Sequence, residues 1–287
     1  MIKSYKYFAL LITLISNINF PAIASDSYTN KGIKDHIVRT TTPTDISRYK
    51  FSLGLELFPY TYTERNVMEY KGLFYGISGA SAIYLGRDDF LQLEGRYAIG
   101  KTSYTSNEGG SFGTKAPNKI MEVRGLYKRN FQLNQKVDLY PFIGFGYRYK
   151  EDDSQDIVST TGHVGVIRKS YYRYIPIGLS MSYNLQKGWN IYASGEYDIF
   201  LNGTQKTFFL LGSITHRQTK GYGLRSEILL EKTFDKYIFS IGPYINYWNI
   251  KDSARDPSII FDRYVICYTK EPKNTTKEVG IKIKFTF

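Results

Sequence analysis

Charged residues of opposite sign recur two positions apart in this sequence, and residues in that pattern can neutralise one another or guide a small ion. Glu94 precedes Arg96 by two residues, and Glu122 precedes Arg124 in the same way. The residues that share this spacing or the same predicted strand face are Glu56, Glu94, Arg96, Glu122, Arg124, Arg148, Glu196, Asp198, Arg225, Glu227 and Glu231. On neighbouring strands such opposite charges meet at bonding distance. We therefore expect an interior charge network, since a buried charge is tolerated only when it is paired.

The chain offers few residues for nucleophilic or metal chemistry. It contains three histidines, His36, His163 and His216, and one cysteine, Cys267. We predict solvated positions for the histidines: two in loops and His36 in an N-terminal tail. No catalytic partner stands beside any of them. A single cysteine excludes an internal disulfide framework and a Cys-rich zinc site. We expect no catalytic residue, no bound metal and no cofactor.

Two acidic groupings leave alternatives open. The run 151–153, together with Asp156, supplies clustered oxygens of the kind that Ca²⁺ binds, but its spacing favours a solvated turn. Glu196 and Asp198 would be the carboxylate pair of an unrecognised hydrolase if they were open to the outside and free of salt bridges.

The first 24 residues have the three-part order of a secretory signal peptide. Lysines precede an apolar run from Phe8 to Ile15, and Ala22-Ile23-Ala24 forms a small-residue cleavage site. The apolar run is too short to cross a membrane as a helix. We predict residues 1–24 as a signal peptide and residues 25–49 as a polar periplasmic tail. Export then argues against nucleic acid as a partner despite a formal charge of +12.

The remaining chain alternates apolar and polar residues with a period of two, which is typical of strands with unlike faces. In one stretch Leu91 and Leu93 fall on one face, while Gln92 and Glu94 fall on the other. The predicted strands are 50–59, 72–85, 89–103, 118–131, 136–150, 170–185, 188–201, 220–234, 236–251 and 276–287. Most are longer than the roughly 5–6 residues of a soluble strand. They are long enough to cross a bilayer, which takes about 9–11 residues.

The connections between these strands alternate between short and long. The long ones are predicted at 60–71, 104–117, 151–169, 202–219 and 252–275. This alternation is typical of an up-and-down meander, and closing the meander removes the strand edges that lipid does not tolerate. We predict an all-β fold, a transmembrane antiparallel up-and-down β-barrel over residues 50–287 with about ten strands. Merging or splitting a hairpin would make that eight or twelve. Both ends and the short turns are then periplasmic, and the long loops are extracellular.

Aromatic residues make up 16% of the chain and gather at the predicted strand ends. Such rings favour the headgroup level of a membrane, so we expect aromatic belts there. The residues assigned to belts are Phe58, Tyr60, Tyr62, Tyr147, Tyr149, Tyr171, Tyr172, Tyr174, Tyr244, Tyr247 and Trp248. Basic residues in or beside the outer loops could neutralise lipopolysaccharide phosphates. They are Lys101, Lys115, Lys119, Lys150, Arg168, Lys169, Arg173, Lys206, Arg217, Lys220, Lys251 and Lys270.

The stretch 280–287 resembles the terminal strand of bacterial outer-membrane proteins, in which alternating apolar residues ending in Phe form the signal read by the barrel-assembly machinery. The residues that carry this resemblance are Ile281, Ile283, Phe285 and Phe287. Stretches 140–149 and 271–278 also look like uncharacterised outer-membrane barrels. A ten-stranded barrel is similar in architecture to the omptin proteases. The omptin Asp-x-His motif is absent, because no acidic residue stands two positions before any histidine.

These observations predict a monomeric barrel in the outer membrane of a Gram-negative bacterium. The function we expect is a non-enzymatic, structural or surface-interaction role, with a lumen largely plugged by the charge network. The expected partners are outer-membrane lipid, lipopolysaccharide and the barrel-assembly machinery. A narrow porin-like channel for ions or small solutes is the alternative. A continuous water-lined gap beside Arg96, Arg124 and Arg225 would favour it. A hydrolase with an unrecognised site is the third possibility.

Overall fold

A computed structural model describes residues 49–86, 88–209, 212–260 and 265–287. The predicted signal peptide, most of the predicted tail and His36 lie outside the described residues. Among the residues that the structure describes, no helix is long and apolar enough to cross a membrane.

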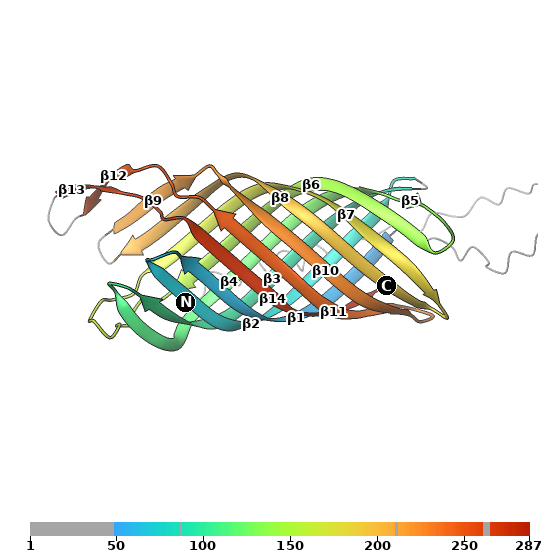
Figure 1. The fold of residues 1–287 in the computed structure, drawn as a ribbon, viewed down its shortest axis with the longest axis horizontal. Helices are drawn as coiled ribbons and strands as arrows, with labels where there is room; N and C mark the ends of the chain where they lie inside the picture. The colour runs from blue at the N-terminus through green and yellow to red at the C-terminus, as the bar shows by residue number, and fades with distance from the viewer. Residues whose placement is uncertain (1–48, 87, 210–211, 261–264) are drawn as a thin grey trace, which may run out of the picture. The chain divides into compact units, whose positions relative to one another are not determined.

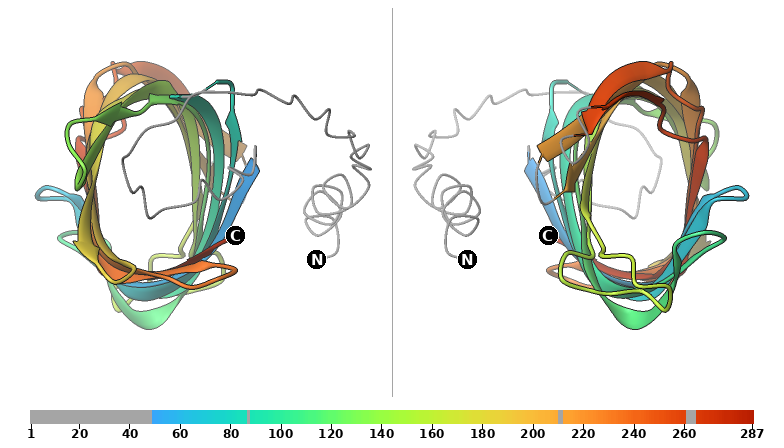
Figure 2. Two further views of the ribbon diagram at one scale, coloured as in Figure 1. Left: turned by 90° about the vertical axis from the view of Figure 1, so that its right-hand side faces the viewer. Right: turned by 90° about the vertical axis from the view of Figure 1, so that its left-hand side faces the viewer.

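Ten long strands pair into a closed antiparallel ring, so the predicted fold class is confirmed (Figures 1 and 2). The strands of the ring are β1 (Tyr49–Glu64), β2 (Met68–Tyr84), β3 (Asp89–Ser106), β4 (Gly110–Arg129), β6 (Val137–Asp153), β7 (Ile167–Gln186), β8 (Trp189–Phe209), β10 (Gly221–Thr233), β11 (Ile238–Ile250) and β14 (Asn274–Thr286). Each strand pairs with its neighbour in this order, and β1 closes the ring on β14. We call the end where β1 begins the turn end and the opposite end the loop end.

Four shorter strands complete the fold: β5 (Phe131–Gln132), β9 (Gly212–Gln218), β12 (Asp256–Ile260) and β13 (Val265–Thr269). Strand β9 pairs with the last residues of β8, beyond the part of β8 that pairs with β10. The β8–β9 hairpin therefore prolongs the wall at the loop end. Strands β12 and β13 form a separate two-stranded hairpin.

Three of the predicted long connections are wrong. In 202–219, β8 continues to Phe209 and pairs with β9. Over 60–71 and 104–117 the strands continue, with β1 and β2 paired as far as Glu64↔Met68 and β3 and β4 paired as far as Ser106↔Gly110. These segments are rich in Thr, Tyr and Ser, and Thr and Tyr favour strands whether or not lipid surrounds them. The change from apolar to polar residues on the outer face marks where the wall leaves the apolar zone. It does not mark the end of the strand.

The two faces of the wall differ as the alternation predicts. Outward-facing Leu53, Leu93 and Ile281 expose 66%, 60% and 56% of their surfaces, whereas inward-facing Glu122 and Arg148 are buried. Large apolar side chains are exposed on successive strands of the ring. A surface of this kind is stable when lipid covers it, because water would be ordered against a large apolar area.

Glycines on the inner face make room for large rings. A Cβ at Gly146 on β6 would overlap the ring of Tyr174 on β7, and one at Gly100 on β3 would overlap Phe74 on β2. Tyr174 and Phe74 are fully buried. The rings therefore lie flat against the neighbouring strand, and the small and large residues of adjacent strands fill the barrel interior together.

We predict that Gly146→Ala lowers the free energy of unfolding by about 1–3 kcal/mol, because the added methyl displaces the Tyr174 ring from a filled interior. Gly125→Ala is the matched control, since a Cβ at Gly125 meets nothing within 4 Å. The measurement is urea unfolding of the refolded barrel in detergent. Equal unfolding midpoints for the two variants would show that the glycine cradle is not required.

Candidate functional site

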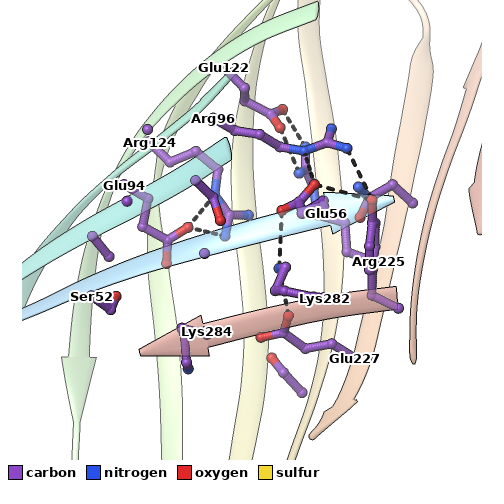
Figure 3. Close-up of a pocket in the computed structure, with 18 of the residues that line it drawn as sticks. Ser52, Glu56, Glu94, Arg96, Glu122, Arg124, Arg225, Glu227, Lys282 and Lys284 are labelled. Carbon is purple, nitrogen blue, oxygen red and sulfur yellow. Dashed lines mark hydrogen bonds and ion pairs between the residues drawn. The ribbon is translucent and has the colours of Figure 1, made fainter. Parts of the chain in front are cut away.

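The charged side chains of the inner face meet around the middle of the barrel (Figure 3). Arg96 on β3 contacts two carboxylates, with its Nε 2.6 Å from Glu56 Oε2 and its Nη1 2.8 Å from Glu278 Oε2. Tyr244 on β11 completes this group, since its hydroxyl donates to Glu56 Oε2 at 3.1 Å. Strand alternation places these side chains in the lumen, because residues two apart point to the same face.

A second group of ions is built around Arg225 on β10. Its Nη2 lies 2.5 Å from Glu122 Oε1 on β4, and its Nε lies 2.8 Å from Asp198 Oδ2 on β8. The hydroxyl of Tyr174 also donates to Glu122 Oε1 at 2.8 Å. A guanidinium presents several donors in one plane, which lets Arg225 hold two acids on different strands at once.

Arg124 on β4 links these charges to another part of the wall. It pairs with Glu94 on the adjacent strand β3, and its Nη1 lies 2.6 Å from Glu196 Oε1 on β8. Glu196 is in turn 3.2 Å from Arg225 Nε. Arg225 is also linked to Arg96, because Glu122 contacts both Arg225 and Arg148, and Glu278 contacts both Arg148 and Arg96. The three arginines Arg96, Arg124 and Arg225 thus belong to one connected set of ion pairs.

Some of these bridges cross the lumen. Arg148 on β6 and Glu278 on β14 lie on opposite sides of the ten-stranded ring, yet Arg148 Nη2 is 2.5 Å from Glu278 Oε1. Both side chains are almost completely buried, at 1% and 0% exposure. Asn246 donates to the other oxygen of Glu278 at 3.0 Å, so its carboxylate is held by three side chains. A charge shielded from water this well requires such partners.

The structure places all nine of the predicted network residues, Glu94, Arg96, Glu122, Arg124, Arg148, Glu196, Asp198, Arg225 and Glu227, on the lumen side of the wall with an ion partner. Glu227 pairs with Lys282 at 2.8 Å, and Lys282 also lies 3.6 Å from Glu56. Sequence reasoning left Glu278 and Lys282 out of the network. The alternation of β14 was the signal for both, since it puts them on the face opposite Val279 and Ile281.

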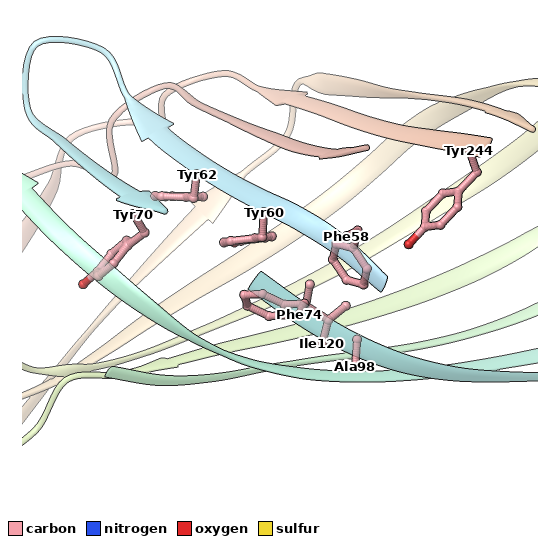
Figure 4. Packing of buried hydrophobic residues seen from close by; sticks show 8 residues of the cluster. All are labelled: Phe58, Tyr60, Tyr62, Tyr70, Phe74, Ala98, Ile120 and Tyr244. Carbon is pink, nitrogen blue, oxygen red and sulfur yellow. The ribbon is translucent and has the colours of Figure 1, made fainter. Parts of the chain in front are cut away.

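Most of the predicted belt residues are instead inside the barrel, which is a correction (Figure 4). One buried cluster contains Phe58, Tyr60, Tyr62, Tyr70, Phe74, Ala98, Ile120 and Tyr244. A second contains Tyr172, Tyr174, Phe200, Trp248 and Ile250. The belt prediction used the position of each ring near a strand end and neglected its parity along the strand. Tyr147, Tyr149, Tyr171 and Tyr247 have the outward parity.

The two clusters pack on the loop-end side of the charged groups. Ring centroids of Tyr174 and Trp248 are 5.0 Å apart in an edge-to-face arrangement, and those of Tyr60 and Phe74 are 4.5 Å apart. Such contacts add stability beyond apolar burial. Arg148 also lies over the Trp248 ring at 5.7 Å. The aromatic layer therefore shields the ion pairs from the loop end.

A further polar layer closes the lumen above the aromatic clusters. Arg168 on β7 reaches Glu64 on the opposite strand β1 at 2.5 Å, and it also contacts Glu271 at 2.5 Å. Lys150 lies 2.9 Å from Asp152 and 3.4 Å from the Tyr62 ring centroid. The prediction that Arg168 and Lys150 face lipopolysaccharide is wrong, because both are buried within the barrel.

Two of three further candidates take other positions than the sequence suggested. His216 is buried on β9 with its Nε2 3.0 Å from Thr269 Oγ1, so the prediction of a solvated loop is wrong. His163 does lie in the β6–β7 connection, next to Thr161. The acidic run 151–153 belongs to β6, where successive side chains point to opposite faces. Among the described residues no acidic or histidine cluster could hold a metal ion.

The pair Glu196 and Asp198 does not meet the condition set for a hydrolase. Both side chains are buried, and each is bound to Arg225. Beside the charged groups, toward the turn end, lies a cavity of about 150 Å³. Its walls include Ser52, Gln92 and Lys284 as well as the network itself. Ligand pockets usually measure about 300–1,000 Å³, so this space suits a few water molecules.

Comparison with solved structures shows the fold that this barrel shares. The outer membrane protease OmpT from Escherichia coli matches with a TM-score of 0.57 and 12% identity, over 86% of this chain and 99% of that chain. The predicted omptin-like, ten-stranded architecture is confirmed. The translocator domain of the autotransporter NalP from Neisseria meningitidis matches with a TM-score of 0.42 and 11% identity, over 84% and 89% of the two chains.

The Ralstonia pickettii toluene transporter TbuX matches with a TM-score of 0.39 and 8% identity, over 83% of this chain and 88% of that chain. At such low identities the likeness concerns the fold alone. No protein-family model and no curated protein sequence matches this chain.

We predict that Glu278→Gln lowers the free energy of unfolding by about 3 kcal/mol, because it leaves the buried guanidinium groups of Arg148 and Arg96 undercompensated. The control is Asp252→Asn, which removes an exposed, solvent-screened pair with Lys270 and should leave the unfolding midpoint unchanged. Urea unfolding in detergent measures both. A Glu278→Gln barrel that unfolds at the wild-type midpoint would contradict the assigned role of the cross-lumen pair.

Glu271 lies in the connection before β14, outside the strands of the ring. Burial raises the pKa of Glu271 to about 7 from an ordinary value of 4.5, and the neighbouring Glu64 adds to the effect while Arg168 opposes it. The folded protein therefore binds a proton that the unfolded chain has released, and its free energy of unfolding falls as the pH rises from 4.5 to about 7.

We predict that Glu271→Gln flattens this pH dependence, because a glutamine side chain has no proton to lose. The measurement is the urea midpoint at pH 5 and pH 8 for wild type and variant. The wild type is expected to lose more stability than the variant between the two pH values. The same loss in both would mean that Glu271 does not titrate in this range.

Proposed function

We propose that this protein is a monomeric outer-membrane β-barrel with a structural or surface-interaction role and a lumen closed to solutes. The observation that carries the proposal is the set of ion pairs that cross the lumen, Arg148 with Glu278 and Arg168 with Glu64. These bridges lie on the two sides of a buried aromatic layer. A solute would have to separate paired charges and displace packed rings to pass.

An outer-membrane location is supported by the outer face of the ring. Exposed apolar side chains occur on successive strands, which is the surface expected in contact with lipid. On β14 the outward positions Ile281 and Phe285 alternate with inward Lys282 and Lys284. We propose that this outward row, with Ile283 and Phe287, is the signal recognised by the barrel-assembly machinery. The turn end then faces the periplasm and the loop end the exterior.

The proposed partners are outer-membrane lipid and lipopolysaccharide, contacted from the outer wall and the loop end. We propose no catalytic activity, because the acidic pair Glu196 and Asp198 is neutralised by Arg124 and Arg225. The cavity of about 150 Å³ beside Arg96 and Arg124 favours a second candidate, a narrow channel for ions or small solutes. The two functions differ in whether the barrel conducts.

We predict that the refolded wild-type barrel is silent in a planar bilayer, whereas Arg148→Ala/Glu278→Ala gives discrete openings. Removing both partners takes out one charge of each sign, while Arg96 keeps its pair with Glu56 and Glu122 keeps its pair with Arg225. Leu93→Ala, on the exposed outer face, is the control and should stay silent. Wild-type openings whose size changes in Arg96→Ala would overturn the closed lumen and favour the channel, with the charge network as its filter.

A further inference from the structure

Three tyrosines form a continuous platform on the outer wall near the loop end. Tyr197 on β8 and Tyr222 on β10 stack with centroids 5.9 Å apart and an interplanar angle of 10°. Tyr222 lies 6.1 Å from Tyr247 on β11. Asn249 donates to the Tyr247 hydroxyl at 3.1 Å, which orders the edge of the platform. All three tyrosines have the outward parity of their strands, because Glu196, Gly223 and Asn246 occupy inward positions.

Cations surround this tyrosine platform. Lys277 on β14 pairs in register with Tyr247, and Arg217 on β9 lies opposite Thr204 on the prolonged hairpin. A backbone hydrogen bond of 2.9 Å from Lys251 to Lys220 brings two more lysines together at the top of β10 and β11. One wall of the barrel, made by β8, β9, β10, β11 and β14, therefore carries these cations, and we call it the tyrosine wall (Figure 1). Its exposed cations are Arg217, Lys220, Lys251 and Lys277.

This wall differs from the opposite wall in its lack of acids. On β2, Glu69 lies 2.6 Å from Lys71, and on β6 the carboxylate of Glu151 pairs with Lys119 at 2.8 Å and with Lys169 at 3.6 Å. On the tyrosine wall the described strand residues of 197–209, 212–224, 243–250 and 274–281 include no outward-facing Asp or Glu. The cations of the opposite wall are neutralised by the protein. On the tyrosine wall, Asp252 pairs with Lys270 and also lies near Lys251. Arg217, Lys220 and Lys277 form no ion pair with the described residues, so these three need counterions from outside.

We propose that the tyrosine wall binds the phosphate-bearing headgroup of a lipid in the surrounding leaflet. The cations neutralise the phosphate, and the tyrosines pack against the sugar or glycerol part of the same molecule. The acyl chains then lie along the apolar residues below, Leu224, Ile245 and Val279, which expose between 42% and 53% of their surfaces. This inference rests on the proposed membrane location and assigns the lipid to one face of the barrel.

A lipid fits this wall better than a soluble polyanion does. The tyrosines stand directly between the cations and the apolar strand surface, an order that matches headgroup, interface and acyl chain. A soluble polyanion would not bind the apolar strand surface below the tyrosines. Phosphate and cation are also expected to contact one another at the edge of the apolar region, where the local dielectric strengthens the attraction.

The experiment uses the refolded full-length barrel in detergent and bis-phosphorylated lipid A as the probe, with binding followed by native mass spectrometry. Arg217→Gln/Lys220→Gln/Lys277→Gln should weaken binding on the order of 100-fold, since each cation near an anionic headgroup contributes about a fivefold change. Tyr222→Leu should weaken binding a few-fold while keeping the wall apolar. Dephosphorylated lipid A should bind the wild type as weakly as the triple variant binds the intact probe.

The matched control is Lys71→Gln/Lys119→Gln/Lys169→Gln, which removes the same number of cations from the opposite wall, where each has an acidic neighbour. We expect its affinity to stay within about twofold of wild type. Equal losses in the two triple variants would mean that net charge alone attracts the lipid and would overturn the site. Displacement of lipid A by millimolar inorganic phosphate would overturn the assignment to a lipid.

A failure of this inference is distinguishable from a failure of the proposed function. Each variant is also inserted into vesicles and checked for heat-modifiable migration and for conductance. A barrel that inserts and stays silent but has no preference for phosphorylated lipid contradicts only the tyrosine wall. A chain that does not insert into bilayers contradicts the membrane location itself.

Discussion

The structure depends on one electrostatic constraint: charges that face the lumen of a narrow barrel must be neutralised inside it. Glu278 illustrates this most clearly, since Arg96, Arg148 and Asn246 converge on its carboxylate from three other strands. A charged side chain in this position is shielded from water, so the loss of any partner lowers the stability of the fold. The strands around the ring are therefore held in register by pairs that join opposite sides as well as by the backbone ladder.

The aromatic layer follows from the same constraint. Rings such as Trp248 and Tyr174 cover the ion pairs on the loop-end side, and this lowers the access of water that would weaken them. The tyrosine hydroxyls of this layer still bind the charged groups, because Tyr174 donates to Glu122 and Tyr244 donates to Glu56. Glycines on adjacent strands provide the space for the rings. Charge pairing, ring packing and glycine placement thus form one interdependent interior.

Local alternation was enough to predict the ring, the ten strands and the inward parity of residues such as Glu94 and Arg96. It could not predict which acid Arg148 would meet, because β6 and β14 come together only through closure of the whole ring. The positions of the aromatic residues could not be predicted for a related reason. A tyrosine is equally suited to a membrane interface and to a polar interior, and only the parity within its own strand separates Tyr247 from Tyr244.

The division of charge between interior and exterior explains why a closed lumen leaves a basic surface. Among the described residues, acids are buried more often than bases. The buried acids are Glu56, Glu64, Glu122, Asp152, Asp198, Glu271 and Glu278, and the buried bases are Lys128, Arg148, Lys150 and Arg168. Taking more acids than bases out of contact with solvent leaves an excess of basic side chains on the outer surface of the described barrel. That excess cannot be balanced by the barrel itself, so anionic molecules around it must supply the counter-charge.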